Sequence, residues 1–367
     1  MARYLWLALA ACGRLHFDAV ATDGRDGSLD GRASDAGAAA NFMFMSSTVQ
    51  AAGSLGGLAG ADALCQQLAS AAGIGDNTYR AWLSTSTVNA KDRLGTARGW
   101  VRRDGVPIAD TQADLLATGA MYPPMLDENG VPWTNFTLPY VVTATDSSGM
   151  LVNGPANTCS DWTDPAGGGP AYATPFNRGL SWAGGIGVFT DCIAATHIFC
   201  FGVDRQVAVV APTVTGRRAF ITASTNPFDP MTGIAGADTA CVNDATAANL
   251  TGSYRALLAT PTASARSRFV TAGASWHRLD GVEVTADLVT MLAPLATTAT
   301  ADYGAGQIPF TGASDPGQPG SNATTCVGWT SKLSTDNVEV GSAASIASWF
   351  GVATVACNVG GSVYCFE

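Results

Sequence analysis

The side chains best suited to bind a ligand lie in one arginine-rich segment, residues 98–103. If this segment is extended, Arg98, Trp100 and Arg102 lie on one face, because side chains alternate along a strand. Two guanidinium groups beside an indole can bind a sulfate or carboxylate while the ring stacks on a sugar. We therefore take Arg98, Trp100, Arg102 and the adjacent Arg103 as a candidate ligand-binding site.

The same segment also fits an ordinary strand with its tryptophan in the core, since tryptophan is mostly buried in proteins. The second half of the chain supports this alternative, because it has Trp276 at the matching place without the flanking arginines. A chain with 29 acidic and 19 basic residues, and a net charge of −10, also attracts polyanions weakly. The same charge argues against nucleic acid as a partner.

No constellation of catalytic or metal-binding residues stands out in the sequence. The three histidines, His16, His197 and His277, are scattered, and none lies near a serine or cysteine in a nucleophile motif. Asp127 and Glu128 adjoin in a segment rich in Pro and Gly, which predicts a solvent-exposed turn. No C-x-x-C pair is present for zinc. We expect no enzyme activity, no metal and no cofactor.

The N-terminal residues resemble a bacterial lipoprotein signal. Arg3 precedes an apolar stretch at residues 4–10, and the sequence LAAC ending at Cys12 is similar to a lipobox, in which the cysteine is acylated. We expect residues 1–12 to be a signal peptide with its lipidation site, and the polar and acidic residues 13–40 to be a flexible tether. This predicts an exported chain, anchored by its lipid alone at the bacterial outer membrane or cell surface.

The remainder of the chain is a duplication. The phrase GLAGADALC at residues 57–65 returns as GIAGADTAC at residues 233–241, and further matching motifs follow in the same order. The period is domain-sized, far longer than that of a solenoid repeat. We predict two tandem domains, repeat one at residues 41–203 and repeat two at residues 217–367, joined by a linker at residues 204–216.

The cysteines divide between the lipid anchor and the two repeats. Of the nine cysteines, Cys12 is the expected anchor and each repeat has four. An even number per domain in an exported chain predicts disulfides, and four cysteines allow three pairings, which the residues alone leave open. The eight are Cys65, Cys159, Cys192 and Cys200 in repeat one, and Cys241, Cys326, Cys357 and Cys365 in repeat two.

Local patterns place the first cysteine of repeat one on a helix. Apolar residues recur along residues 60–72 with helical spacing, and Cys65 lies within this stripe. A strand is predicted at residues 78–84, and a second helix beginning at Asp110 or Thr111. Short apolar runs among Gly, Pro, Ser and Thr then predict long loops between short strands.

Arg80 and Arg255 occupy the same place in the two repeats, inside an apolar strand. An unpaired buried charge is costly, so we predict that both arginines are structural and pair with a carboxylate or with carbonyl groups. Asp62 and Asp238, on the first helix of each repeat, are the candidate partners.

The succession of motifs resembles the endostatin domain of collagens XV and XVIII, within the C-type lectin-like superfamily. In repeat one the matching motifs are GLAGADALCQQLASAAG, TYRAWLS, RRDGVPIADTQADLL, CSDWT and CIAATHIFCF, and repeat two has the same order. The resemblance covers most of residues 42–201 and 219–367. It implies an α+β fold with two helices around a twisted, mostly antiparallel sheet and long loops. It also implies nested disulfides, Cys65–Cys200 with Cys159–Cys192 and Cys241–Cys365 with Cys326–Cys357.

Two departures from that superfamily bear on metals. Sugar-binding C-type lectins hold calcium through an acidic loop and a Trp-Asn-Asp run, but the corresponding residues 181–184 and 348–351 lack the oxygen ligands that calcium needs. Endostatin's zinc site relies on N-terminal histidines, and residues 41–47 have none. The resemblance therefore carries neither calcium nor zinc to this chain.

Taken together, the residues and the resemblance predict a non-enzymatic cell-surface lipoprotein. Endostatin-like modules occur in bacterial surface lipoproteins, and the expected partner is a glycan, a matrix component or another protein. The alternative is a structural or scaffold lipoprotein of the envelope. An enzyme of the C-type lectin-like superfamily is a distant third, because no convergent acid, base and nucleophile are evident.

Overall fold

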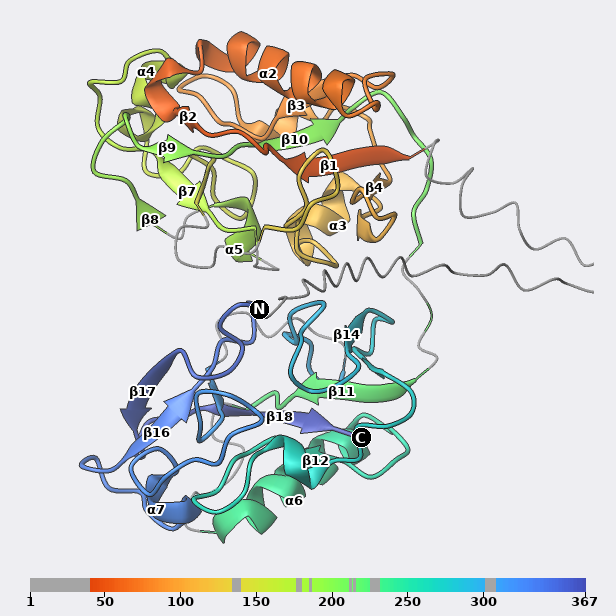
Figure 1. The fold of residues 1–367 in the computed structure, drawn as a ribbon, viewed down its shortest axis with the longest axis vertical. Coiled ribbons are helices and arrows are strands. Elements are labelled where there is room, and N and C mark those ends of the chain that lie inside the picture. Colours follow the sequence, from red (N-terminus) through yellow and green to blue (C-terminus); the bar gives the residue numbers. More distant parts are fainter. Residues whose placement is uncertain are drawn as a thin grey trace, which may run out of the picture.

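The structure is a computed structural model of the 367-residue chain. It describes residues 40–133, 140–175, 180–184, 187–210, 213, 216–224, 232–300 and 308–367. The expected signal peptide, the lipidation site Cys12 and the tether up to residue 39 lie outside the described residues. Two α+β halves follow one another along the chain, and each has its own sheet and its own core (Figure 1).

Repeat one is built on a mixed five-stranded sheet in the order β3-β10-β1-β4-β5. Its strands are β1 (Asn41–Met45), β3 (Tyr79–Ala81), β4 (Trp100–Val101), β5 (Pro107–Ala109) and β10 (Phe199–Gly202). The short strands β2 (Gln50–Ala51) and β9 (Ala195–Thr196) form a pair, and β6 (Val141–Val142), β7 (Ala171–Ala173) and β8 (Gly187–Val188) form a small third sheet. The helical segments are η1 (Ala52–Ser54), α2 (Gly57–Ala71), η2 (Ala90–Arg93), α3 (Gln112–Ala117), η3 (Pro155–Thr158), α4 (Cys159–Trp162) and α5 (Leu180–Ala183).

Repeat two repeats most of this plan around an eight-stranded sheet, ordered β14-β13-β11-β18-β15-β16-β17 with β12 also paired to β18. Residues 286–300 form no helix at the place of α3, so the expected second helix is absent from this part of repeat two. Its strands are β11 (Arg217–Ile221), β12 (Arg255–Ala256), β13 (Trp276–His277), β14 (Glu283–Thr285), β15 (Pro309–Phe310), β16 (Asn337–Val340), β17 (Ala353–Ala356) and β18 (Ser362–Phe366). Its helical segments are α6 (Gly233–Ala247), η5 (Arg266–Arg268) and α7 (Cys326–Trp329). Even the register is kept, because Phe44 pairs with Cys200 in repeat one and Phe220 pairs with Cys365 in repeat two.

The repeated phrase forms the long helix of each repeat, as the spacing predicts. Helix α2 begins at Gly57, three residues before the predicted start, and it ends where Gly73 adopts a left-handed conformation (φ 73°). Ala61, Cys65 and Ala69 form its buried face, and Leu64 and Leu68 lie partly buried beside it. The second predicted helix is α3, which Thr111 caps in a reciprocal box with Asp114.

Four disulfides brace the two halves. They are Cys65–Cys200, Cys159–Cys192, Cys241–Cys365 and Cys326–Cys357, the pairs that the resemblance implies. The bridges from α2 and α6 to the central strands β10 and β18 close long loops, with sequence separations of 135 and 124. Loops of this length lower the entropy of the unfolded chain by an amount worth about 4–5 kcal/mol each. Such bracing is typical of a protein that folds outside the cytoplasm.

The CSDWT and CVGWT motifs form the same left-handed turn in both repeats. Backbone φ is positive from Cys159 to Trp162 and again from Cys326 to Trp329. In each turn the preceding threonine hydroxyl accepts the backbone N–H three residues on, at 3.0 Å. The tryptophan that ends each turn is fully buried, and its indole N–H donates to a backbone carbonyl. The motif therefore places a buried tryptophan three residues after a disulfide-bonded cysteine in each repeat.

The predicted linker begins later than residue 204. The side-chain amide of Asn41 donates to the carbonyl oxygen of Arg205 at 2.8 Å, and the backbone N–H of Val209 donates to Asp110 at 2.8 Å. Residues 204–209 thus pack against repeat one and extend it. The sequence missed this because the segment has no periodic apolar pattern.

Candidate functional site

The indole of the predicted arginine-rich site is not available to a ligand. Strand β4 lies between β1 and β5, and its Trp100 is fully buried in the core of repeat one. The indole N–H donates to the carbonyl oxygen of Gly202 at 2.9 Å, and the ring packs edge-on against Phe201. The prediction that Trp100 stacks on a sugar is therefore wrong, and the alternative, a core tryptophan, is what the structure has.

The three arginines around Trp100 each bind a different neighbour. Arg98 is ion-paired with Asp110, and that hydrogen-bonded carboxylate raises the pKa of the guanidinium. Arg102 is ion-paired with Asp104 at 2.5 Å. Arg103 donates to the carbonyl oxygen of Glu128 at 2.8 Å, and its guanidinium lies over the ring of Phe42. Arg98 and Arg102 are thus paired with separate aspartates, and they do not form the expected site for one sulfate.

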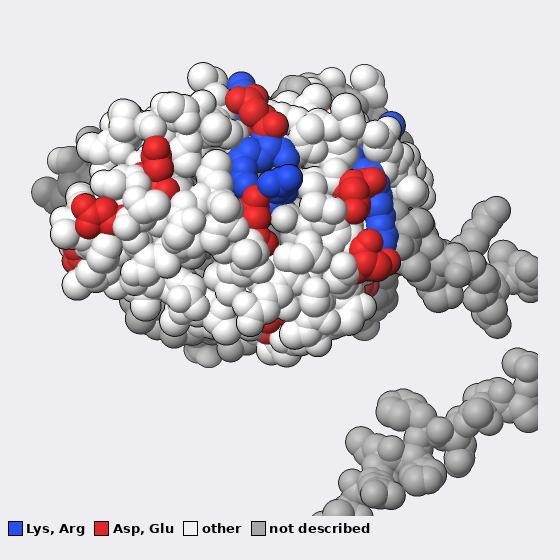
Figure 2. All heavy atoms as spheres, turned by 90° about the horizontal axis from the view of Figure 1, so that it is seen from above, with Lys and Arg blue, Asp and Glu red and all other residues white. Residues whose placement is uncertain are grey.

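The charges on the upper face of repeat one, as it is oriented in Figure 1, are mixed. Figure 2 shows repeat one from the top of the view in Figure 1. On that face the positive side chains lie next to negative ones, and large uncharged areas separate these groups. Opposite charges that adjoin in this way largely cancel beyond their own separation, and salt screens the remaining field within about 10 Å. A polyanion would therefore find little net attraction on this face.

The adjacent acids Asp127 and Glu128 differ from the expected solvated turn. Asp127 does shape a turn, since it accepts the backbone N–H groups of Asn129 and Val131. Glu128, however, is buried, and its carboxylate binds the backbone N–H of Ser47 at 2.9 Å and the serine hydroxyl. It ties the loop to the end of β1, and this explains its burial without a catalytic role.

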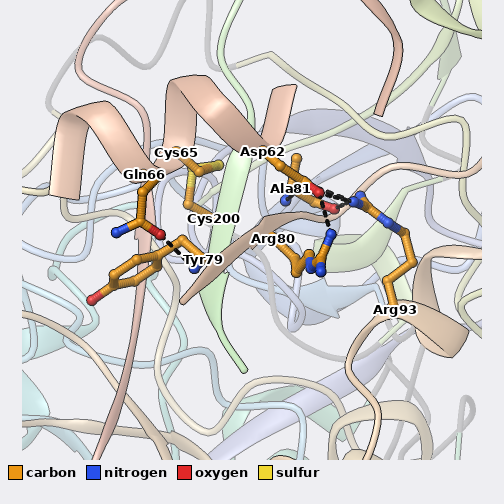
Figure 3. Close-up of polar contacts among 8 residues, drawn as sticks. All are labelled: Asp62, Cys65, Gln66, Tyr79, Arg80, Ala81, Arg93 and Cys200. Atoms are coloured by element: carbon orange, nitrogen blue, oxygen red, sulfur yellow. Dashed lines mark hydrogen bonds and ion pairs between the residues drawn. A yellow bond between two sulfur atoms is a disulfide. The ribbon is translucent and has the colours of Figure 1, made fainter. Parts of the chain in front are cut away.

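Asp62 is the centre of a charged network that fastens α2 to the sheet (Figure 3). Its carboxylate accepts from Arg80 at 2.8 Å, from Arg93 at 2.6 Å and from the backbone N–H of Ala81 at 2.9 Å. Arg93 is the buried partner, with a side chain 7% exposed, and it also donates to the carbonyl oxygen of Ala81. Arg80 pairs with Asp62 as predicted, but its side chain is 48% exposed.

Repeat two has the same network, but without a counterpart of the exposed ion pair that Arg80 makes with Asp62. Asp238 accepts from Arg268 at 2.6 Å and from the backbone N–H of Ala256 at 2.9 Å. Arg255 is exposed, so the prediction that it is a buried partner of Asp238 is wrong. The strand alternates, and both Arg80 and Arg255 fall on its outward face. The alignment that pairs Arg80 with Arg255 also pairs Arg93 with Arg268, and this signal could have found the true partners.

The two repeats pack on each other through equivalent segments. Tyr122 of repeat one lies in a buried apolar cluster with Val282 and Ala293 of repeat two. The backbone N–H of Glu283 donates to the Tyr122 hydroxyl oxygen at 2.9 Å, and burial raises the pKa of that phenol. The fully buried Arg278 donates to the carbonyl oxygens of Pro294 (2.9 Å) in its own repeat and Met121 (3.3 Å) in the other.

Beside this contact lies a cavity of about 780 Å³ with walls from both repeats. Its size is within the range of small-molecule and peptide-binding pockets, which often form between domains. The apolar wall includes Met125, Leu126, Met291, Leu292, Trp349 and Phe350. The charged groups along it are Arg102, Asp104 and Asp315. An apolar cavity with a few polar groups can hold a ligand, and this one needs both repeats.

Within the described residues, no group of three or more His, Cys, Asp or Glu side chains could hold a metal ion. In the same part of the chain, no helix is both long and apolar enough to cross a membrane. No protein-family model matches this chain, and no curated protein matches it.

Proposed function

We propose that this chain is a non-enzymatic, exported surface lipoprotein that recognises a glycan, a matrix component or another protein. Cys12 would carry the lipid anchor at the outer membrane, and the two halves would be endostatin-like domains of the C-type lectin-like superfamily. The duplicated motifs, the disulfide pairs and the left-handed turn shared by both halves support this relationship. Neither calcium nor zinc takes part in this proposal.

The observation that carries the proposal is the cavity between the repeats. Side chains from both halves line it, so the duplication creates a site that one domain alone would lack. Trp349 and Phe350 give it an aromatic wall, and aromatic side chains are enriched where proteins bind partners. The disulfides hold the surrounding elements in place before binding, which lowers the entropic cost of recognition.

One observation favours the alternative, a scaffold lipoprotein. The apolar patch around Tyr122 and Val282 is shared between the copies, and it serves their packing on each other. A protein whose apolar surface is buried between its own two repeats could act as a stable spacer. The scaffold function does not explain the cavity between the repeats, and we therefore place the scaffold function second.

The experiment is an array of glycans, matrix proteins and envelope proteins, probed with the oxidised full chain carrying Cys12→Ser to remove the lipid. The recognition function predicts saturable binding to a subset of the array that does not change when calcium is chelated. The scaffold function predicts a different result: no binding to the glycans or matrix proteins, and capture of an envelope protein that binds no external ligand.

A further inference from the structure

Repeat one contains a second hollow, of about 400 Å³, walled by aromatic rings. Trp133, Tyr140, Phe189 and His197 line it, and the small side chains of Ala194 and Ala195 leave room between them. It lies beside β6 and β9 and shares no lining residue with the cavity between the repeats, although Pro132, next to Trp133 in the chain, lines that cavity. We refer to it as the aromatic pocket.

Neighbouring rings hold the aromatic walls in place. Tyr140 packs edge-on against Phe189 at 5.3 Å and against Tyr172 at 4.6 Å, both measured between ring centroids. Trp133 packs edge-on against His197 at 4.5 Å. Ring pairs of this kind contribute about 0.5–1.5 kcal/mol beyond the burial of their area. The four lining rings therefore form a fixed surface, although each is only partly buried except His197, which is 3% exposed.

His197 supplies the pocket with a neutral hydrogen-bonding group. Its Nδ1 lies 2.6 Å from the carbonyl oxygen of Ser46, so Nδ1 carries the proton and donates it there. Burial lowers the pKa of the imidazole, which keeps the ring neutral near pH 7. In this tautomer Nε2 is an acceptor.

Among the described residues, no charged side chain lines the aromatic pocket. Glu128 is close enough to act electrostatically on His197, but its carboxylate is already bound to Ser47. The described lining therefore offers a cationic ligand rings without a carboxylate, and it offers an anionic ligand no cation. Uncharged hydroxyl groups, in contrast, can be satisfied by an imidazole nitrogen and a phenol.

We propose that the aromatic pocket binds a neutral carbohydrate, with the C–H face of a sugar ring on Tyr140 and Trp133 and a sugar hydroxyl donating to His197. This inference goes beyond the proposed function, which the cavity between the repeats carries, and it names neutral rather than sulfated sugars. An aromatic ring stacked on a ligand is worth about as much as one of the ring pairs above. The site is independent of calcium.

Repeat two offers a built-in comparison. Alignment of β10 with β18 places Ser362 at the position of His197 and Thr354 at that of Phe189. The strand before it has Ile308 at the position of Tyr140, since Val141 and Pro309 are bridged to His197 and Ser362 in the two repeats. Tyr140, Phe189 and His197 thus have non-aromatic counterparts, and the proposal assigns sugar binding to repeat one alone.

The test is titration of the oxidised full chain carrying Cys12→Ser with three neutral probes: maltotriose, cellotriose and the N-acetylglucosamine trimer. Ligand-observed NMR and calorimetry would follow binding, with choline and a heparin disaccharide as charged probes. We expect saturable binding of at least one neutral sugar, weakened about tenfold or more by Tyr140→Ala and by Trp133→Ala. Tyr140→Phe keeps the ring and should retain binding, and Ile308→Ala, the matched change in repeat two, should leave it unaltered.

Three results would overturn the proposal. Binding of choline without any sugar would make the pocket a cation site. Sugar binding that survives Tyr140→Ala and Trp133→Ala but is lost on Leu292→Asp would move the site to the cavity between the repeats, and the proposed recognition function would still stand. Failure of all three sugars to bind a chain with intact disulfides and an unchanged unfolding midpoint would remove the site altogether.

Discussion

Arg102 and Arg278 occupy the same place in the two repeats, but Arg278 donates a hydrogen bond to the other repeat whereas Arg102 lines the cavity between them. Each guanidinium is ion-paired with the aspartate two residues on, and each backbone N–H donates across the same turn at 2.8 Å. Arg278 reaches the carbonyl oxygen of Met121 in the other repeat, whereas Arg102 lines the cavity. The repeats thus meet through equivalent segments, and of these two arginines Arg278 makes the hydrogen bond across the boundary.

The first prediction compares these two arginines. Arg278→Ala should lower the free energy of unfolding by about 3 kcal/mol or more, because it leaves buried carbonyl oxygens without their donor. Arg102→Ala should cost less, about 1–2 kcal/mol, because Arg102 also donates to the carbonyl oxygen of Pro123 but its partner Asp104 is 41% exposed and can be solvated. Urea unfolding of both variants measures the difference. Equal losses would show that the contact across the boundary adds nothing.

The second prediction concerns the network around Asp62. Arg93→Ala should destabilise repeat one by about 2–4 kcal/mol, because Arg93 is buried and bonds both Asp62 and the carbonyl of Ala81. Arg80→Ala should change stability by less than about 1 kcal/mol, as expected of an exposed ion pair. Denaturant titration of the two variants distinguishes them. A larger effect of Arg80 would contradict the structural role assigned to Arg93.

The third prediction uses the left-handed turn. Val327 is a β-branched residue at φ 56° with a 41% exposed side chain, a conformation that costs L-residues about 1–2 kcal/mol. Val327→Gly should therefore raise the stability of repeat two by about 1 kcal/mol, even though it removes side-chain atoms. Thermal unfolding tests this. Gly328→Ala, the neighbouring position with φ 69°, should act in the opposite direction.

The fourth prediction is a pH dependence of repeat one. Burial lowers the pKa of His197 below its ordinary value of 6.5, so the unfolded chain binds the proton more readily than the folded one. The stability that this histidine contributes is complete above the unfolded-state pKa and is lost as the pH falls through it and on toward the lower folded-state value. Urea midpoints measured between about pH 7.5 and pH 5 should fall in the native chain.

A His197→Gln variant is the control for that pH dependence. Glutamine can still donate to the carbonyl of Ser46, yet it does not titrate. The pH slope of the variant should be flatter than that of the native chain over the same interval. An identical slope in both proteins would assign the dependence to another group.

The sequence predicted what local periodicity and duplication encode. The long helix, the capped helix at Thr111 and the strand at Tyr79 follow from apolar spacing and capping residues. The resemblance implied the disulfide pairs. The burial of Trp100 was one of two open interpretations, because alternation along a short strand does not say which face is inside.

What the sequence could not predict depends on contacts between distant segments. The repeat alignment marks Arg93 and Arg268 as equivalent, but that Arg93 reaches Asp62 depends on how the chain after β3 folds back toward α2. The aromatic pocket joins rings from four separate segments, including Trp133 and Phe189. The cavity between the repeats follows from how two separately folded halves meet, and no periodic pattern within either half encodes that.

The measurement that tests recognition through the cavity most directly is calorimetric titration of the Cys12→Ser chain with the strongest ligand from the array. Three variants would be compared: Leu292→Asp, which places a charge on the cavity wall; Ala347→Trp, which fills it; and Leu333→Asp, the same charge at an exposed site elsewhere in repeat two. We predict one ligand per chain, binding weakened about tenfold or more by the first two changes, and no effect of the third. Equal affinity in all four proteins would contradict a ligand site between the repeats.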